Sequence, residues 1–303
     1  MTPAIWLASY PKSGNTWFRA LLANLRSGAD EPADINDMTE AGGIASARAP
    51  FDANLLIESG LLTHEEADKL RPRLYELLAG GTDHLDDETD LVGRTRFRKV
   101  HDAYALTGKG EALLAGARGA SGAIVIVRDP RDIAPSLANH MRTGLDPAIE
   151  FMADPASAFC GGRAGQPNQL RQRLFDWSGH VSSWLDQTDI PTHLVRYEDL
   201  QTDTVGVLAG ALAFAGESAS GHDIRRAVEH ASFAELQRQE RERGFREAPR
   251  PHGPTPFFRR GDAGAWREEL TTEQTARIEA QHAAMMGRLG YELSVPTGVA
   301  VTA

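Results

Sequence analysis

The sequence contains a single cysteine, Cys160, among its 303 residues. An intramolecular disulfide is therefore excluded, and a lone thiol fits a reducing compartment. The first residues lack the basic segment of a signal peptide, and no apolar run approaches the ~20 residues that a membrane span needs. We accordingly expect a cytoplasmic protein without a membrane partner.

The sequence also lacks an excess of basic residues, because 42 Asp and Glu outnumber 32 Lys and Arg and give a formal net charge of −10. A general nucleic-acid binder normally has a basic surface, so nucleic acid is not expected as a partner. Any anionic ligand must instead be met by a local cluster of cations. No cluster of Cys and His and no repeated Asp pattern indicates a metal site, so metal-free chemistry is expected.

Short apolar runs that alternate with helical patterns predict a parallel sheet covered on both faces. We therefore expect an α/β fold, a three-layer sandwich with a central parallel sheet. The length and a hydrophobic content of 41% support one domain over residues 1–303. The expected strands are Ala4–Ser9, Thr95–His101, Ala123–Arg128 and Thr192–Tyr197.

Two stretches, residues 27–60 and 143–167, are rich in Gly, Pro, Asp and Ala and show little periodicity. They are predicted to be loops or insertions, plausible as lids over a site. Residues 27–93 as a whole are expected to be an insertion of helix and loop that caps the site. Residues 294–303 are expected to form a disordered tail.

Helix signals occur in three places. Asn15–Arg26 is amphipathic, and a capping-box pattern at Thr63 predicts a helix that runs toward Leu78 and is interrupted at Pro72. An apolar stripe between residues 168 and 187 predicts one long helix whose stripe packs in the core. The stripe consists of Leu170, Leu174, Trp177, Val181 and Trp184.

The segment Tyr10–Trp17, with the sequence Tyr-Pro-Lys-Ser-Gly-Asn-Thr-Trp, connects the first strand to the first helix. N–H groups at a helix start have no intrahelical partner and lie at the positive end of the helix dipole, so together with Lys12 they suit a phosphate. In the P-loop of nucleotide-triphosphate enzymes the Lys follows the second Gly and a hydroxyl residue for Mg²⁺ comes next. Here Lys12 precedes Gly14 by two positions, which favours a phosphate-binding loop without that metal arrangement.

A second candidate anion site lies at Arg128, which ends a buried strand, and at Ser136 in the following helix. Asp129 is a natural N-cap and Pro130 fits the first helical position. Ligands bind at the carboxyl edge of such sheets, so Arg128 and Ser136 are placed to face a phosphate. The alternative is that Arg128 is a structural ion-pair partner. Pro135 is expected to bend the helix just before Ser136.

A third candidate is the segment Phe257–Trp266, where Arg259 and Arg260 are followed by Gly261. Two guanidinium groups in a flexible loop are able to close over an anion, with Trp266 as an anchor for the loop. The alternative is a solvated basic turn.

These three motifs, together with Lys99-Val100-His101, resemble those of the soluble sulfotransferases that use 3′-phosphoadenosine-5′-phosphosulfate (PAPS). The four motifs occur in the family's order and span roughly residues 5–291. The resemblance implies a P-loop-like 5′-phosphosulfate loop, PAPS as donor co-substrate, the 3′,5′-bisphosphate PAP as product, and no metal. Asn15 stands where the family often has Thr, and Arg260 where it has Lys.

The resemblance also implies roles for individual residues. His101 is expected to be the general base, while Lys12 stabilises the leaving 5′-phosphate and Lys99 adds positive charge near the transferring group. The residues implied to bind the nucleotide are Lys12, Ser13, Gly14, Asn15, Thr16, Trp17, Arg128, Ser136, Tyr197, Phe233, Arg259, Arg260 and Gly261. Trp17 is expected to stack on adenine, with Tyr197 and Phe233 near the base; core packing is the alternative for all three.

The implied acceptor is a small molecule with an alcohol or phenol hydroxyl; a bacterial secondary metabolite, a glycoside and a lipid-like alcohol are all compatible. An aromatic content of 7% and the two candidate lids favour a roomy acceptor pocket. Two other functions stay open: a small-molecule kinase with a P-loop, and a PAP-binding module without catalysis. The family's dimer signature is reduced here to Arg267, Thr271, Thr272 and Ala276, so the oligomeric state is left open.

Overall fold

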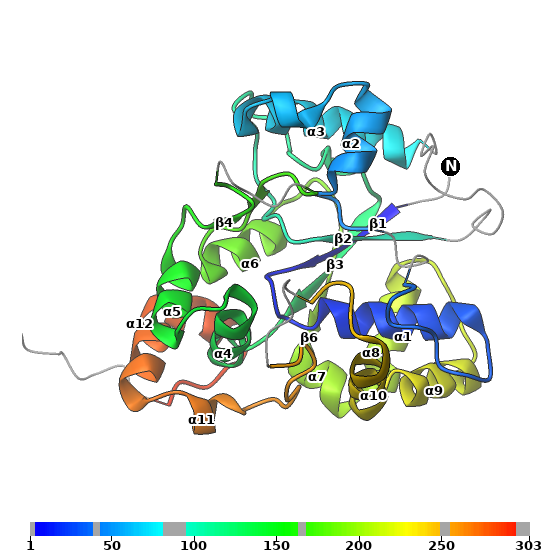
Figure 1. Cartoon of the computed structure of the whole chain (residues 1–303), viewed down its shortest axis with the longest axis vertical. Helices are drawn as coiled ribbons and strands as arrows, with labels where there is room; N and C mark the ends of the chain where they lie inside the picture. The colour runs from blue at the N-terminus through cyan, green and yellow to red at the C-terminus, as the bar shows by residue number, and fades with distance from the viewer. Residues whose placement is uncertain (1–3, 39–42, 81–94, 163–167, 249–254, 295–303) are drawn as a thin grey trace, which may run out of the picture.

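The computed structural model describes residues 4–38, 43–80, 95–162, 168–248 and 255–294. Its main sheet has four parallel strands in the order β2-β1-β3-β6, with helices on both sides (Figure 1). The strands are β1 (Ala4–Ser9), β2 (Arg96–Val100), β3 (Gly122–Val127) and β6 (Thr192–Arg196). The predicted α/β sandwich is confirmed, and each predicted strand is found with ends shifted by at most one residue.

The side chains of β1 point alternately into two hydrophobic cores. Trp6 and Ala8 lie in one core, and Ile5 and Leu7 lie in the other, as the two-residue repeat of a strand requires. The first core is covered by α2 (Arg48–Leu55), α3 (His64–Ala79), α4 (Pro130–Met141), α5 (Leu145–Ala153), α6 (Trp177–Leu185) and α12 (Thr272–Arg288). The second is covered by α1 (Asn15–Ser27), α7 (Tyr197–Thr202), α8 (Thr204–Phe214), α9 (Gly221–His230) and α10 (Phe233–Arg243).

Both segments predicted to be loops or insertions contain helices, so neither is a loop throughout. Residues 27–60 include α2, which buries Phe51, and residues 143–167 include α5, which buries Ile149 and Met152. Tertiary burial of a few side chains stabilises these short helices despite their weak periodicity. The second segment also includes the strand β4 (Ala158–Phe159).

The capping box predicted at Thr63 is present, but α3 continues through Pro72 instead of being interrupted there. Helix α4 likewise runs through Pro135, after the predicted N-cap at Asp129. In both helices residues beyond the proline are buried, so tertiary packing offsets the backbone hydrogen bond that proline removes.

The long helix predicted between residues 168 and 187 does not form. Helix α6 begins only at Trp177, because the Asp176 side chain accepts a hydrogen bond from the Gly179 N–H and caps the helix there. Residues 172–173 instead form β5 (Gln172–Arg173), which pairs antiparallel with β4. Leu170 is nevertheless buried in the first core. The apolar stripe therefore predicted burial correctly, but its prediction of one long helix was wrong.

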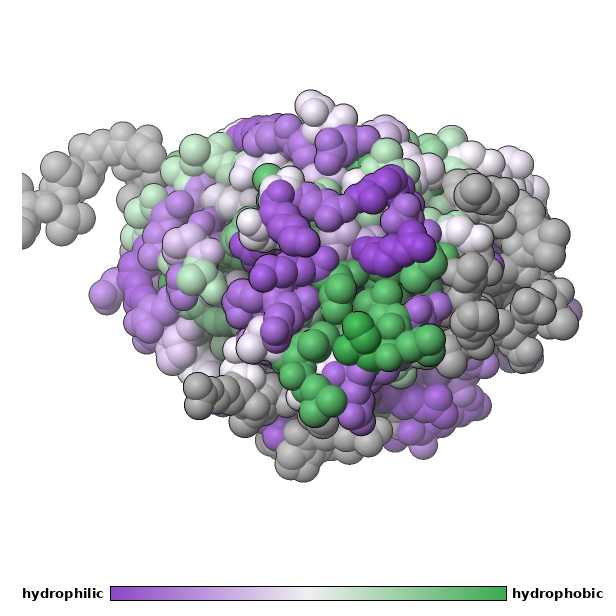
Figure 2. Space-filling model, turned by 90° about the horizontal axis from the view of Figure 1, so that it is seen from above, coloured by the Kyte–Doolittle hydropathy of each residue, from purple (hydrophilic) through white to green (hydrophobic). Residues whose placement is uncertain are grey.

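The cap formed by α2 and α3 is attached to the sheet through a buried ion pair. The Arg71 guanidinium on α3 donates to both carboxylate oxygens of Asp102, at 3.0 and 2.6 Å, and both side chains are fully buried. Asp102 directly follows His101, so the cap is fixed next to that residue. Exposed Leu56, Ile57 and Leu61 lie on the same part of the chain, and Figure 2, which looks onto this side, shows an apolar patch bordered by hydrophilic residues.

Two remaining segments complete the fold: the short helix α11 (Trp266–Glu269) and the start of the predicted tail. The Ser294 N–H and hydroxyl both donate to Glu279, and residues 295–303 lie outside the described residues. None of the helices in the described ranges is both long and apolar enough to span a bilayer.

Candidate active site

A cavity of about 1300 Å³ opens at the carboxyl ends of all four parallel strands. Lys12, His101, Arg128 and Tyr197, each just beyond the end of a different strand, line it. This edge of an α/β sheet is where ligands bind. Of the fifteen predicted site residues, all line the cavity except Ser13, which is buried beside it.

The turn between β1 and α1 has the geometry of an anion cradle. Gly14 is the N-cap residue of α1, with φ of 101° and no side chain to cap the first amides. A Cβ on Gly14 would lie 2.4 Å from the Tyr197 ring, so only glycine fits. The Ser13 hydroxyl is buried and has no hydrogen-bond partner among the described residues. Asn15 is tied to β1, because its Nδ2 donates to the Leu7 carbonyl at 2.9 Å.

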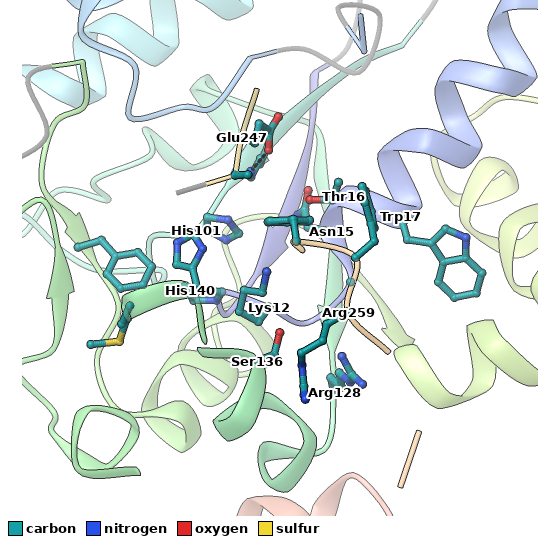
Figure 3. Close-up of a pocket in the computed structure, with 18 of the residues that line it drawn as sticks. Lys12, Asn15, Thr16, Trp17, His101, Arg128, Ser136, His140, Glu247 and Arg259 are labelled. Atoms are coloured by element: carbon teal, nitrogen blue, oxygen red, sulfur yellow. Dashed lines mark hydrogen bonds and ion pairs between the residues drawn. The ribbon is translucent and has the colours of Figure 1, made fainter. Parts of the chain in front are cut away.

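Lys12 lies at the centre of the site, with its Nζ 3.6 Å from the centroid of the Phe257 ring. Burial, with added effects of the nearby charges of Lys99 and Arg128, lowers the pKa of Lys12 to about 7. An anion placed beside Lys12 would restore its charge, so the site favours a negatively charged ligand. Figure 3 shows Lys12 directed toward the space between His101, Arg128 and Arg259.

Lys99 is held by Glu247, a residue that the sequence analysis did not identify. The Glu247 carboxylate accepts from Lys99 Nζ at 2.8 Å and from Arg19 at 2.6 Å. Burial acts to raise the pKa of Glu247, but the two cations outweigh it and lower the pKa to about 2. Glu247 is 148 residues from Lys99 and belongs to no motif, so no local sequence signal could have identified it.

The ring of His101 is oriented by the end of β1. Its Nδ1 lies 2.8 Å from the Ser9 carbonyl oxygen, which can only accept, so Nδ1 carries the proton and Nε2 keeps a free lone pair. Burial, followed by the charge of Lys99, lowers the pKa of His101 well below its usual value. The imidazole is therefore neutral near pH 7 and able to accept a proton.

Arg128 and Ser136 both face the cavity, as Figure 3 shows. The Arg128 guanidinium lies 4.2 Å from the Tyr197 ring centroid and donates one hydrogen bond to the Asp262 carbonyl at 3.0 Å. Its Nε is buried without a partner, and Arg128 has no ion-pair partner within the described ranges. The alternative of a structural ion pair is thus not favoured.

The Arg259–Gly261 loop is docked over the cavity rather than solvated. The Gly261 carbonyl accepts from the Tyr197 hydroxyl, and a Cβ on Gly261 would lie 2.5 Å from the Phe233 ring. Arg259 pairs with Glu269 at 2.5 Å, while Arg260 pairs with Glu268 at 2.7 Å. Both arginines are therefore near the cavity but engaged by carboxylates.

Two features anchor this loop. Asp132 accepts from the Gly264 and Trp266 N–H groups at 2.6 and 2.9 Å. The Trp266 ring is buried and lies 4.2 Å from the Arg131 guanidinium, in agreement with its predicted role as an anchor.

Three aromatic residues, Trp17, Tyr197 and Phe233, also line the cavity. The Trp17 indole N–H donates to the Ala231 carbonyl at 2.9 Å, and its ring is 5.6 Å from that of Tyr197. Phe233 packs against Phe258 at 6.1 Å. The predicted adenine-binding residues are thus brought together at one wall of the cavity.

The family model described as "Sulfotransferase domain" matches residues 121–290, more than half of the chain. This chain belongs to the sulfotransferase family. Cytosolic sulfotransferase 17 of Arabidopsis thaliana is 23% identical, over 90% of this chain and 71% of that protein. Luciferin sulfotransferase of Photinus pyralis is 25% identical, over 91% and 69%. The family predicted from the four motifs is confirmed. The classification as a PAPS-dependent sulfotransferase enzyme is confirmed with it, at the level of the family.

Solved structures with the same fold include retinol dehydratase in complex with androsterone and the inactive cofactor PAP. It superposes on this sulfotransferase with a TM-score of 0.57 at 20% identity, covering 98% of this chain and 84% of that one. Mouse sulfotransferase SULT7A1 complexed with PAP gives a TM-score of 0.54 at 18% identity, covering 94% and 84%. At these identities the similarity establishes the fold.

Proposed function

We propose that this sulfotransferase moves the sulfuryl group of PAPS to a hydroxyl of a small-molecule acceptor, as a single domain acting in the cytoplasm without a metal. The observation that carries the proposal is the convergence of Lys12, Arg128 and Arg259, from three distant segments, on one cavity. The buried and unpaired Ser13 hydroxyl and Arg128 Nε fit a phosphorylated nucleotide, because each could donate to a phosphate oxygen. The solved relatives with bound PAP support the same nucleotide class.

The residues divide between the two ends of the nucleotide. Lys12 and the amides of residues 13–16 would hold the 5′-phosphate end, while Arg128, Ser136 and the Arg259–Gly261 loop would hold the 3′-phosphate. Trp17, Tyr197 and Phe233 would surround the adenine ring. When bound, PAPS supplies the activated sulfuryl group.

Side chains of the protein would then accept the proton of the acceptor hydroxyl and stabilise the charge on the leaving group. Nε2 of His101 accepts the proton of the acceptor hydroxyl as its oxygen becomes nucleophilic. Lys12 and Lys99 stabilise the negative charge that develops on the leaving oxygen, a stabilisation greatest in the transition state. Glu247 keeps Lys99 charged and fixed in position.

The acceptor side of the cavity is bordered by residues from the two predicted lids, including Ile44, Phe151 and Phe159. Two solved structures of retinol dehydratase contain the alcohols androsterone and retinol, which supports a small molecule with a hydroxyl group as acceptor. We extend the proposal to the cap and lids as the elements that shape this pocket.

The rival functions can be separated by calorimetry. PAP is expected to bind in the presence of EDTA more tightly than ATP, because the loop lacks the Lys and hydroxyl positions of a Mg²⁺-dependent P-loop. Binding of ATP that requires Mg²⁺ would instead support the kinase. Incubation with PAPS and pooled hydroxyl compounds, followed by mass detection of an added SO₃, separates an enzyme from a binding module. PAP binding without any transfer would contradict the proposed catalysis.

The affinity for PAP is expected to decrease as the pH rises from 7 to 9. Because the pKa of Lys12 is about 7 in the free protein, binding of an anion in this range requires uptake of a proton. The phosphates are already ionised there, since their second pKa is about 6, so the decrease reports on Lys12. Calorimetry should show Kd rising by up to about tenfold per pH unit. The Lys12→Met variant should show a flatter dependence and the exposed-site control Lys109→Met the same slope as the parent; an equally steep slope in Lys12→Met would refute this.

A further inference from the structure

A second imidazole, that of His140, lines the same cavity as His101 and has no role in the chemistry described above. His140 lies in the last turn of α4, four residues after Ser136. Its Nδ1 is buried without a hydrogen-bond partner among the described residues. Burial, with added effects of Lys12 and Lys99, lowers the pKa of His140 to about 3. The ring is therefore neutral and offers one nitrogen that can only accept a hydrogen bond.

His140 belongs to a wall of the cavity that we call the acceptor wall, formed by His140, Phe151, Phe159 and Gln172. The ring centroids of His140 and Phe159 are 5.9 Å apart, and Phe159 stacks on Phe151 at 5.5 Å. Gln172 is the antiparallel partner of Phe159, so both side chains lie on the same face of the β4–β5 pair. An aromatic surface and polar side chains thus lie together.

Gln172 offers the wall a second unpaired acceptor atom. Its Nε2 donates to Gln169 Oε1 at 2.5 Å, which sets the orientation of the amide. Its Oε1 is buried and has no partner within the described ranges. Buried acceptor atoms without partners are rare in folded proteins, and at a cavity wall they indicate that a ligand supplies the donors.

We infer that His140 determines acceptor specificity by accepting a hydrogen bond from a hydroxyl next to the one that reacts. The acceptor is then a ring that carries two or more neighbouring hydroxyl groups. The inference rests on the proposed function, in which His101 takes the proton of the reacting hydroxyl. Both rings line the same cavity, Figure 3 shows them on the same side of the view, and the positive charge of Lys99 lowers the pKa of both.

The remaining residues of the acceptor wall fit the same substrate class. The face of a ring packs on Phe159, and Gln172 Oε1 accepts from a further hydroxyl. Phenolic rings and sugar rings share this chemistry, since each presents a flat or apolar face and hydroxyl donors at its edge. A ring with one hydroxyl would leave the His140 acceptor atom buried and unpaired, which favours the diol over the single alcohol.

The test compares kcat/KM with PAPS for matched pairs of acceptors. Catechol and 2-methoxyphenol form the phenolic pair, and methyl glucoside and its 2-deoxy derivative form the sugar pair. For whichever pair the parent protein sulfates, kcat/KM of the diol should exceed that of its partner by about tenfold or more. His140→Phe, which keeps the contact with Phe159, should bring this ratio close to one. His140→Gln should retain part of it, and the exposed-site control His222→Gln should retain all of it.

Equal kcat/KM for both members of a pair in the parent protein would overturn the inference and leave the proposed function intact. An unchanged ratio in His140→Phe, with PAP binding and melting temperature as checks of folding, would overturn it as well. If none of the four compounds accepts a sulfuryl group while PAP binds, the failure counts against the proposed function. Calorimetry on the PAP-loaded protein then decides the inference: tighter binding of the diols supports it, and equal binding overturns it.

Discussion

Replacing His101 with alanine is expected to lower kcat by about 10²–10⁴-fold, the range typical of a lost general base, while the affinity for PAP changes little. The reason is positional: His101 lines the cavity at the end of a different strand, whereas the nucleotide is proposed to bind through Lys12, Arg128 and Arg259. Single-turnover rates with PAPS give the chemical step, and calorimetry with PAP gives the binding. His222→Ala is the matched control, because His222 is exposed and is not one of the residues that line the cavity.

Two outcomes would contradict the role of His101. If the variant lost PAP affinity and turnover together, His101 would be a structural residue of the nucleotide site rather than a base. If kcat were unchanged, another group would have to accept the proton. An intermediate result is informative too, because the neutral imidazole of His140 lines the same cavity, and the double variant would show whether it substitutes.

Much of the site was predictable because its signals are local. The strand β1, the turn with Lys12 and Gly14 and the start of α1 are contiguous, so the anion cradle follows from the order of residue types. The end of β3 at Arg128 with its N-cap Asp129 is equally local. Parallel strands then bring these ends to one edge of the sheet, which makes the meeting of Lys12, His101 and Arg128 predictable from the fold class alone.

The unpredicted features depend on contacts between distant segments. Glu247 reaches Lys99 across 148 residues, and His140 faces the cavity only because of where α4 docks. The false long helix at residues 168–187 has a related cause: Leu170 and Leu174 are buried, but periodicity cannot tell a helix from a buried turn and a short strand. The prolines in α3 and α4 show the same limit, since tertiary packing decides whether a helix continues.

Replacing Glu247 with alanine is expected to have the largest effect on stability, because it leaves the side chains of Lys99 and Arg19 without their shared partner. These are only 12% and 6% exposed. Breaking a fully buried pair costs roughly 3–5 kcal/mol. Because the Glu247 side chain is 33% exposed, we expect a smaller loss, about 2 kcal/mol of the free energy of unfolding. Urea denaturation measures it, with Glu242→Ala, which removes the exposed pair with Arg238, as a control expected to lose at most ~1 kcal/mol.

The same variant should also lose activity, because burial already lowers the pKa of Lys99 and Glu247 is the group that raises it. Without that carboxylate a larger fraction of Lys99 is uncharged, so less positive charge is available to the transition state.

The stability of the protein at acid pH also depends on the Glu247 carboxylate. The pKa of Glu247 is lowered to about 2 in the folded state, so its contribution to stability is present above pH ~4.5 and lost as the pH falls toward 2. Glu247→Ala should therefore lack this part of the acid destabilisation. If the variant kept both the stability and the kcat of the parent, Glu247 would be neither a support for the fold nor a positioning residue for Lys99.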